Sequence, residues 1–285
     1  MVSKPEYGNC QALLNMRFFS HKPNFYKVMA RQKGIIKLKG TIGDVSFYKS
    51  KDGYLAREKG GVDGDRIRND PAFQRTRENG SEFGRAGKAG KILRNALRLL
   101  LQNASDSKVT SRLTKEMLRI IKTDTNSARG QRSIAQGDLN LLGGFDFNIN
   151  GKLGATMYAP YQSQVDRASG ACGVTIPDFI PGNTIAFPSG ATHMKFLVGA
   201  AGVDFETEAF EFQQVDSGEL VIGPDVVNQL DLAVNLTADN ELDIFLVLGI
   251  DFLQEVNGAM YPLKNGSYNP LAIVGLDQFV EAPAE

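Results

Sequence analysis

The chain contains no tryptophan, and its 285 residues include only two cysteines and two histidines. Cys10 and Cys172 are too few and too far apart to predict a disulfide framework, and neither lies in a Cys/His pattern that would hold zinc. His193 stands in a predicted β segment without an HExxH pattern, which is typical of a structural or surface histidine. We therefore expect a reducing compartment, no metal and no cofactor.

Long apolar runs are missing as well. In residues 1–28 the apolar residues 12–14 are followed at once by Asn15, and no run anywhere approaches 18 apolar residues. These absences predict a cytoplasmic protein without a membrane span, a location compatible with assembly into a particle or surface structure. The segment 1–28 has no clear periodicity, so it is either disordered or an extension upstream of a true start at Met29.

Recognisable catalytic motifs are also absent. Residues 84–92 resemble a phosphate loop, but five residues separate Gly84 from Gly90 where that motif requires four, and Ile92 stands where Ser or Thr would hold magnesium. The nucleophile-elbow pattern GxSxG does not occur either. We expect no enzyme activity, no catalytic residues and no small-molecule substrate.

Three acidic residues form the only candidate for cation binding. Asp204, Glu206 and Glu208 alternate within a predicted strand, so their carboxylates would share one face. Calcium prefers such oxygen ligands, but no loop with the spacing of an EF-hand accompanies them. The pattern favours a solvated strand face over a metal site.

Charge is unevenly distributed along a chain whose formal net charge is zero. Residues 1–142 carry 28 lysines and arginines against 13 acidic residues, a balance of +15, whereas residues 143–285 carry 4 against 19, a balance of −15. Opposite charge predicts attraction within a molecule, head-to-tail attraction between copies, or a basic arm for a polyanion. We accordingly expect a basic module over 29–142, an acidic domain over 143–280 and a short tail over 281–285.

The basic module is predicted to combine short strands with a helical hairpin. Segments 35–39, 45–49 and 54–59 read as a β-meander, with 40–43 as one turn and Asp52-Gly53 as a tight hairpin turn. Asp70-Pro71 predicts a helix start, and the helix is expected to continue to about residue 102. A second helix is predicted over 109–122, because its apolar residues fall on one stripe at helical spacing. The polar stretch 123–137 reads as a linker.

Glycines recur on one face of the first helix, at spacings of three and four. Glycine inside a helix costs about 0.5–1 kcal/mol relative to alanine, so a compensating close contact is expected. The alternative is a helix break between residues 80 and 90. The candidate packing residues are Gly80, Gly84, Gly87 and Gly90.

The acidic domain reads as a series of short strands. The 30 glycines and 11 prolines of the chain favour a strand-and-turn protein. Hairpin turns are predicted at Asn150-Gly151, Asn257-Gly258 and Asn265-Gly266, and the apolar run 244–248 predicts a central buried strand. The fold class is therefore expected to be α+β, with an immunoglobulin- or fibronectin-like β-sandwich. Its strands are predicted at 145–149, 152–158, 173–176, 184–187, 192–199, 203–215, 219–222, 230–237, 242–255, 259–263 and 271–276.

Basic side chains interleaved with aromatic ones make residues 31–132 the candidate contact region. Cations near aromatic rings suit phosphate neutralisation and base stacking. The competing interpretation, which the matched charge of the two halves favours, is a surface for self-association or for a protein partner. The candidate contact residues are Lys37, Lys39, Lys49, Lys51, Arg57, Arg66, Arg68, Arg75 and Arg77.

The segments 34–48, 53–57 and 69–75, together with Phe83, resemble a family of uncharacterised bacterial proteins. Members open with a glycine-punctuated β segment, continue with a polar helix start and end in an immunoglobulin-like β domain. The resemblance covers about residues 29–280. It implies a bacterial origin and a two-part architecture, and it assigns no activity or site residues. We expect a non-enzymatic structural or interaction protein, with nucleic-acid association as the alternative.

Overall fold

The computed structural model describes residues 29–50, 53–58, 61–104 and 106–280. The chain divides into two compact units, Met1–Arg66 and Ile67–Glu285. The compositional boundary between residues 142 and 143 therefore falls inside the second unit, where helices of the basic half share a core with strands of the acidic half. The predictions for 1–28, for Lys51 and Asp52 and for 281–285 lie outside the described residues.

The first unit is a four-stranded antiparallel sheet with the order β1-β4-β3-β2. Its strands are β1 (Met29–Arg31), β2 (Gly40–Ile42), β3 (Val45–Ser50) and β4 (Gly53–Glu58), and α1 (Gly64–Asn69) follows. The predicted strand 35–39 is wrong, because this segment is a loop between β1 and β2. The side chain of Gln32 takes the place of a strand partner, accepting from the N–H of Leu38 at 2.8 Å and donating to the carbonyl of Leu55 at 3.0 Å.

The first long helix is continuous through its glycines. Asp70 caps its start by accepting the N–H of Ala72 at 2.9 Å, ahead of η1 (Pro71–Phe73) and α2 (Gln74–Ala96). The alternative of a break between residues 80 and 90 is therefore wrong, and the interruption lies at Leu97, before α3 (Arg98–Leu101). The second helix is confirmed as α4 (Val109–Thr123), with its predicted apolar stripe buried.

The stretch 124–137 is not a free linker, since it is bound to α2. Glu82, only 2% exposed, accepts the N–H of Gly130 at 2.9 Å. Arg85 donates to the carbonyl of Arg132 at 2.5 Å and also to that of Gly130. Asp124 has no exposed surface and accepts backbone N–H groups of this stretch. Long-range polar contacts thus fold the stretch onto the helix.

The second unit has two antiparallel sheets and several short helical turns. The long sheet contains β7 (His193–Val203), β8 (Phe210–Asp216), β9 (Leu220–Val221), β11 (Asp243–Val256), β12 (Ala259–Pro262) and β13 (Leu271–Asp277). The short sheet contains β5 (Gln162–Asp166), β6 (Ala171–Ile176) and β10 (Leu230–Asn235). The helical turns are η2 (Leu139–Leu142), α5 (Leu153–Thr156), α6 (Pro181–Thr184) and η3 (Leu263–Gly266).

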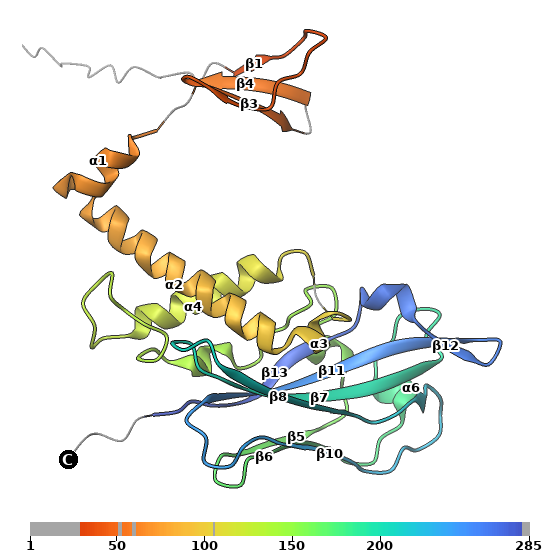
Figure 1. Ribbon diagram of the computed structural model, residues 1–285. Helices are drawn as coiled ribbons and strands as arrows, with labels where there is room; N and C mark the ends of the chain where they lie inside the picture. Colours follow the sequence, from red (N-terminus) through yellow and green to blue (C-terminus); the bar gives the residue numbers. More distant parts are fainter. Residues whose placement is uncertain (1–28, 51–52, 59–60, 105, 281–285) are drawn as a thin grey trace, which may run out of the picture. The chain divides into compact units, whose positions relative to one another are not determined.

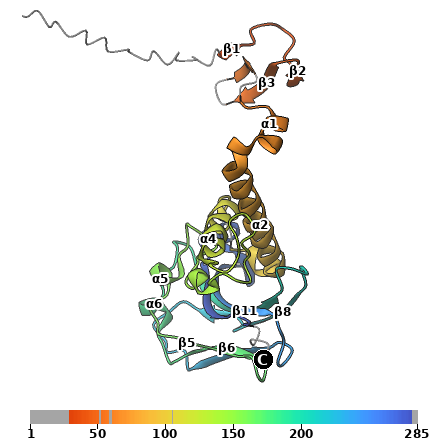
Figure 2. The same ribbon diagram turned by 90° about the vertical axis from the view of Figure 1, so that its left-hand side faces the viewer.

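Three layers make up this unit, as Figures 1 and 2 show: α2 and α4 lie on one face of the long sheet, and β5, β6 and β10 lie on the other. One apolar core fills each interface. Along β11, Phe245 and Val247 face the helices, while Leu246 and Leu248 face the short sheet. The α+β class is confirmed. An immunoglobulin-like sandwich is not, because helices cover one face of the long sheet.

The hairpin predictions have different outcomes. Asn257-Gly258 forms the turn between β11 and β12, with φ of 52° and 78°, as a tight primed turn requires. The predicted hairpin at Asn150-Gly151 is wrong, because residues 145–152 form no strand and α5 (Leu153–Thr156) follows them. A Cβ on Gly151 would lie 2.3 Å from the carbonyl oxygen of Tyr268. This glycine permits close backbone packing, and α5 occupies most of the predicted strand 152–158. Asn265-Gly266 lies in η3, so this predicted hairpin is also wrong.

Candidate interaction surfaces

Cations lie over aromatic rings on both faces of the first unit's sheet. Lys49 is the cross-strand partner of Tyr54, and its ammonium lies 5.7 Å from the ring centroid. Lys37 approaches the same ring at 5.9 Å. On the opposite face the guanidinium of Arg57 lies 5.4 Å from the centroid of Tyr48. Such cation–π pairs contribute about 0.5–1 kcal/mol at exposed sites.

The predicted contact residues do not belong to one body. Lys37, Lys39, Lys49, Arg57 and Arg66 lie in the first unit, whereas Arg68, Arg75 and Arg77 lie in the second, and Lys51 is outside the described residues. Arg77 is engaged in structure, since it donates to the carbonyls of Ile67 at 2.8 Å and Asp70 at 2.9 Å. The sequence placed these cationic residues in one predicted module, whereas the structure divides them between two units.

The first unit has almost no apolar core among its described residues. Leu55 is the one buried apolar side chain there. The loop 32–39 instead leaves Ile35 fully exposed and Ile36 80% exposed, and Ile42 on β2 is 62% exposed. A sheet of this size needs an apolar face packed against something to be stable. The exposed apolar set is therefore a candidate contact surface.

The glycine face of α2 makes a close contact at one position. A Cβ on Gly90 would lie 3.5 Å from Leu113 of α4, which is an ordinary packing distance. Beside Gly80, Gly84 and Gly87, no described atom outside the neighbouring backbone of the helix lies within 4 Å of such a Cβ. The expected contact is thus found at one glycine of the four. The other three lie on the same helix as Phe83, which is 59% exposed.

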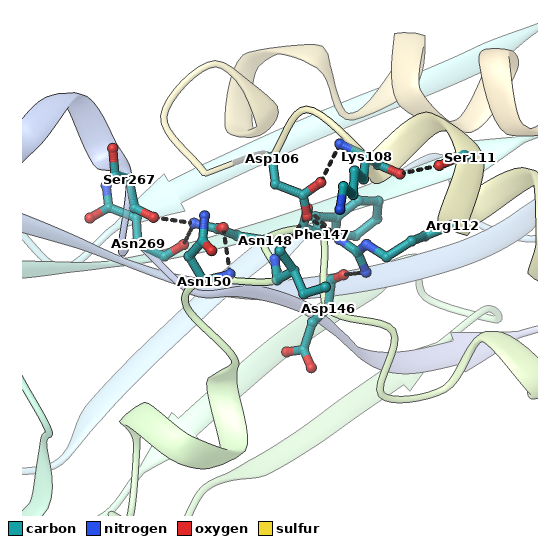
Figure 3. Close-up of polar contacts among 11 residues, drawn as sticks. Asp106, Lys108, Ser111, Arg112, Asp146, Phe147, Asn148, Asn150, Ser267 and Asn269 are labelled. Carbon is teal, nitrogen blue, oxygen red and sulfur yellow. Dashed lines mark hydrogen bonds and ion pairs between the residues drawn. The ribbon is translucent and has the colours of Figure 1, made fainter.

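A buried polar network holds the segment between η2 and α5 against α4 (Figure 3). Asp106 accepts Arg112 at 2.5 Å and the N–H of Ile149 at 2.8 Å. Arg112 also donates to the carbonyls of Asp146 at 2.7 Å and Phe147 at 3.0 Å. Burial raises the pKa of Asp106, but bonds from Ile149, Arg112 and the backbone of Lys108 outweigh it and lower the pKa.

Asparagines continue this network toward β13. Asn148 has no exposed surface and donates to the carbonyls of Ser267 and Asn269, 3.1 and 2.9 Å away (Figure 3). Asn269 in turn donates to the carboxylate of Asp251 at 2.9 Å. Each of these side chains binds a structural partner, so the arrangement fixes these loops.

Nothing in the described part of the chain assembles a metal centre, because no three His, Cys, Asp or Glu side chains gather there. Asp204, Glu206 and Glu208 lie in the loop after β7, so the expectation that they share a strand face is wrong. Asp204 accepts the N–H of Glu206 at 2.8 Å, and Glu208 forms an ion pair with Lys88 at 2.9 Å. These carboxylates shape the loop.

The described part of the chain also contains His193 and Cys172, and both lie in strands. His193 begins β7, and its Nδ1 lies 3.0 Å from the hydroxyl of Thr192. Burial, ahead of the nearby Asp166 carboxylate, raises the pKa of the Cys172 thiol to about 11, so it stays protonated near neutral pH. Residues 84–91 lie within α2, whereas a phosphate loop precedes its helix. His21 and Cys10 lie outside the described residues.

Comparisons with protein families, with curated proteins and with solved structures found no match to this chain. The described helices include none with the length and apolar content to cross a bilayer.

Proposed function

We propose that this chain is a non-enzymatic assembly protein, in which the basic first unit of one copy binds the acidic β-rich part of another copy. The observation that carries the proposal is the apolar surface of the first unit, which exposes Ile35, Ile36 and Ile42, while Leu55 is the one buried apolar side chain among its described residues. Packing against a partner would supply the missing core. A component of a phage-derived or surface assembly is one concrete form of this proposal.

The charge distribution supports a second copy as the partner. The first unit, residues 1–66, carries 13 lysines and arginines against 6 acidic residues, a balance of +7, and residues 67–285 carry 19 against 26, a balance of −7, so each molecule carries both halves of an attractive pair. A contact between unlike surfaces is heterologous, and repetition of such a contact makes a closed ring or an open filament. A protein partner with an acidic surface is the nearest variant of this proposal.

Sedimentation velocity of the full chain tests the proposal. Charge-driven association should give oligomers at about 50 mM salt that dissociate toward monomers at about 0.5 M salt, because the Debye length shortens from about 14 to about 4 Å. Negative-stain microscopy at the lower salt should show rings or filaments. A strict monomer at low salt and high protein concentration would contradict the proposal.

Nucleic-acid binding is the second candidate, supported by the Arg57–Tyr48 and Lys49–Tyr54 pairs. Bases stack on aromatic rings while nearby cations neutralise phosphates. Fluorescence anisotropy with labelled single-stranded and duplex DNA at about 50 mM salt would then show binding that weakens steeply as salt rises. Absence of binding under these conditions removes this candidate.

A further inference from the structure

Two exposed segments of the chain are opposite in charge and alike in apolar character. The loop 32–39 presents Ile35 and Ile36 between the exposed lysines Lys33 and Lys39. Residues 219–226 present Val221 and Val226, 62% and 59% exposed, beside the exposed carboxylates of Glu219 and Asp225. The two segments are complementary. In a contact between them, apolar side chains would meet at the centre and unlike charges would pair at the rim.

The basic loop has a defined shape. Gln32 donates its side-chain amide to the carbonyl of Leu38 at 3.2 Å and accepts the N–H of Leu38 at 2.8 Å, which closes the loop at its base. Lys37 donates to the carbonyl of Gln32 at 2.5 Å, so its ammonium is also held at the base. Ile35 and Ile36 therefore project from a closed loop, which lowers the ordering cost of binding.

The acidic segment is held on both sides. Val221 on β9 pairs with His193 of β7, and the carbonyl of Gly223 accepts the N–H of Gly182 at 2.9 Å. Leu220 and Ile222 pack against the core between the sheets, so the intervening Val221 faces outward. Because the segment is held on both sides, a local rearrangement would not bury these outward apolar side chains.

We infer that the loop 32–39 of one copy binds residues 219–226 of a second copy, and that this is the contact of the head-to-tail assembly. This inference rests on the proposed function. A second copy is favoured over an anionic lipid surface, because residues 143–285, with a balance of −15, would be repelled from such a surface.

A charge swap in the full chain tests the contact. Lys33→Glu with Lys39→Glu, or Glu219→Lys with Asp225→Lys, should each weaken the association at 50 mM salt by about tenfold or more, since like charges then face each other. Combining all four substitutions should restore the association. Controls with the same change of charge are Lys115→Glu with Lys122→Glu, and Glu206→Lys with Glu241→Lys, at exposed positions outside the two segments.

The apolar part of the contact is tested separately. Ile35→Ser with Ile36→Ser should also weaken association by about tenfold or more, while Ile149→Ser, at a position 47% exposed, should leave it unchanged. Circular dichroism should be the same for all variants, because the altered side chains are exposed.

Three results would overturn the inference. If the wild-type chain associates but the segment variants behave like the controls, the contact lies elsewhere and the proposed function stands. A monomeric wild-type chain removes both the contact and the proposed function. Sedimentation of the chain with phosphatidylserine vesicles, lost in the Ile35→Ser, Ile36→Ser variant, would assign the loop to lipid.

Discussion

Single buried polar residues decide where irregular segments of this chain fold. Asp124 is the clearest case, because its carboxylate accepts the N–H groups of Asn126 and Ser127 at 2.9 Å and of Ser133 at 3.0 Å. Burial by itself raises the pKa of Asp124, but the bonds from Ser127, Ser133 and Asn126 outweigh it and lower the pKa to about 2. The charged form therefore stabilises the turn that brings residues 124–137 back to α2.

Asp124→Asn should lower the free energy of unfolding by about 2 kcal/mol at pH 7, because a pKa lowered from 3.8 to about 2 corresponds to that energy. The stabilisation is complete above pH 3.8 and is lost as the pH falls toward 2. Urea unfolding between pH 7 and pH 2 should accordingly show a smaller loss of stability in the variant than in the wild type. Glu241→Gln, at an exposed position, serves as control, and equal pH dependence in wild type and Asp124→Asn would refute this role.

At the scale of elements, α2 combines a packed half with an open half. Gly90 lies against Leu113, whereas the space beside Gly80 and Gly84 is open among the described residues. Glycine occupies these open positions although alanine is a better helix former. The helix is continuous because its buried residues, among them Ala86, Ile92 and Leu93, pack in the core against the long sheet.

Gly80→Ala and Gly84→Ala should each raise the free energy of unfolding by about 0.5–1 kcal/mol, since alanine restricts the unfolded chain and favours helix. Gly90→Leu should lower it by about 1–3 kcal/mol through overpacking against α4. Urea denaturation of the three variants checks both signs. A loss of stability in Gly80→Ala would show that this face is packed against something in solution.

At the scale of the whole molecule, packing and charge follow different boundaries. The core between helices and long sheet contains Leu113 and Met117 from the basic half together with Phe245 and Val247 from the acidic half. The position near residue 142 where the charge balance changes sign thus lies inside a single folded unit. The division found in the structure lies between Arg66 and Ile67.

A fragment of residues 67–280 should therefore fold, with one cooperative thermal transition and dispersed NMR signals. A fragment of residues 143–280 should not, because Phe245 and Val247 would lose the helices that cover them and expose a large apolar face. Circular dichroism and ANS binding of the two fragments separate these outcomes. Cooperative unfolding of the shorter fragment would show that the acidic half is a domain of its own.

Local patterns by themselves determined several parts of this protein. The stripe of α4, the long apolar run within β11 and the Asn257-Gly258 turn are recognisable because periodicity and turn chemistry act over a few residues. The opposite charges of the two halves are likewise visible in composition. The candidate cationic residues could be chosen from composition, but composition did not reveal that they belong to two different units.

The tertiary structure decided the rest, because the partners are far apart in the chain. Gln32 binds the carbonyl of Leu55, so residues 35–39 form a loop. Asn148 binds the carbonyl of Asn269, 121 residues away, so the segment before α5 forms no hairpin. Such contacts leave no periodic signal in the sequence. The exposure of Ile35 and Ile36 also became visible only when the surrounding chain was in place.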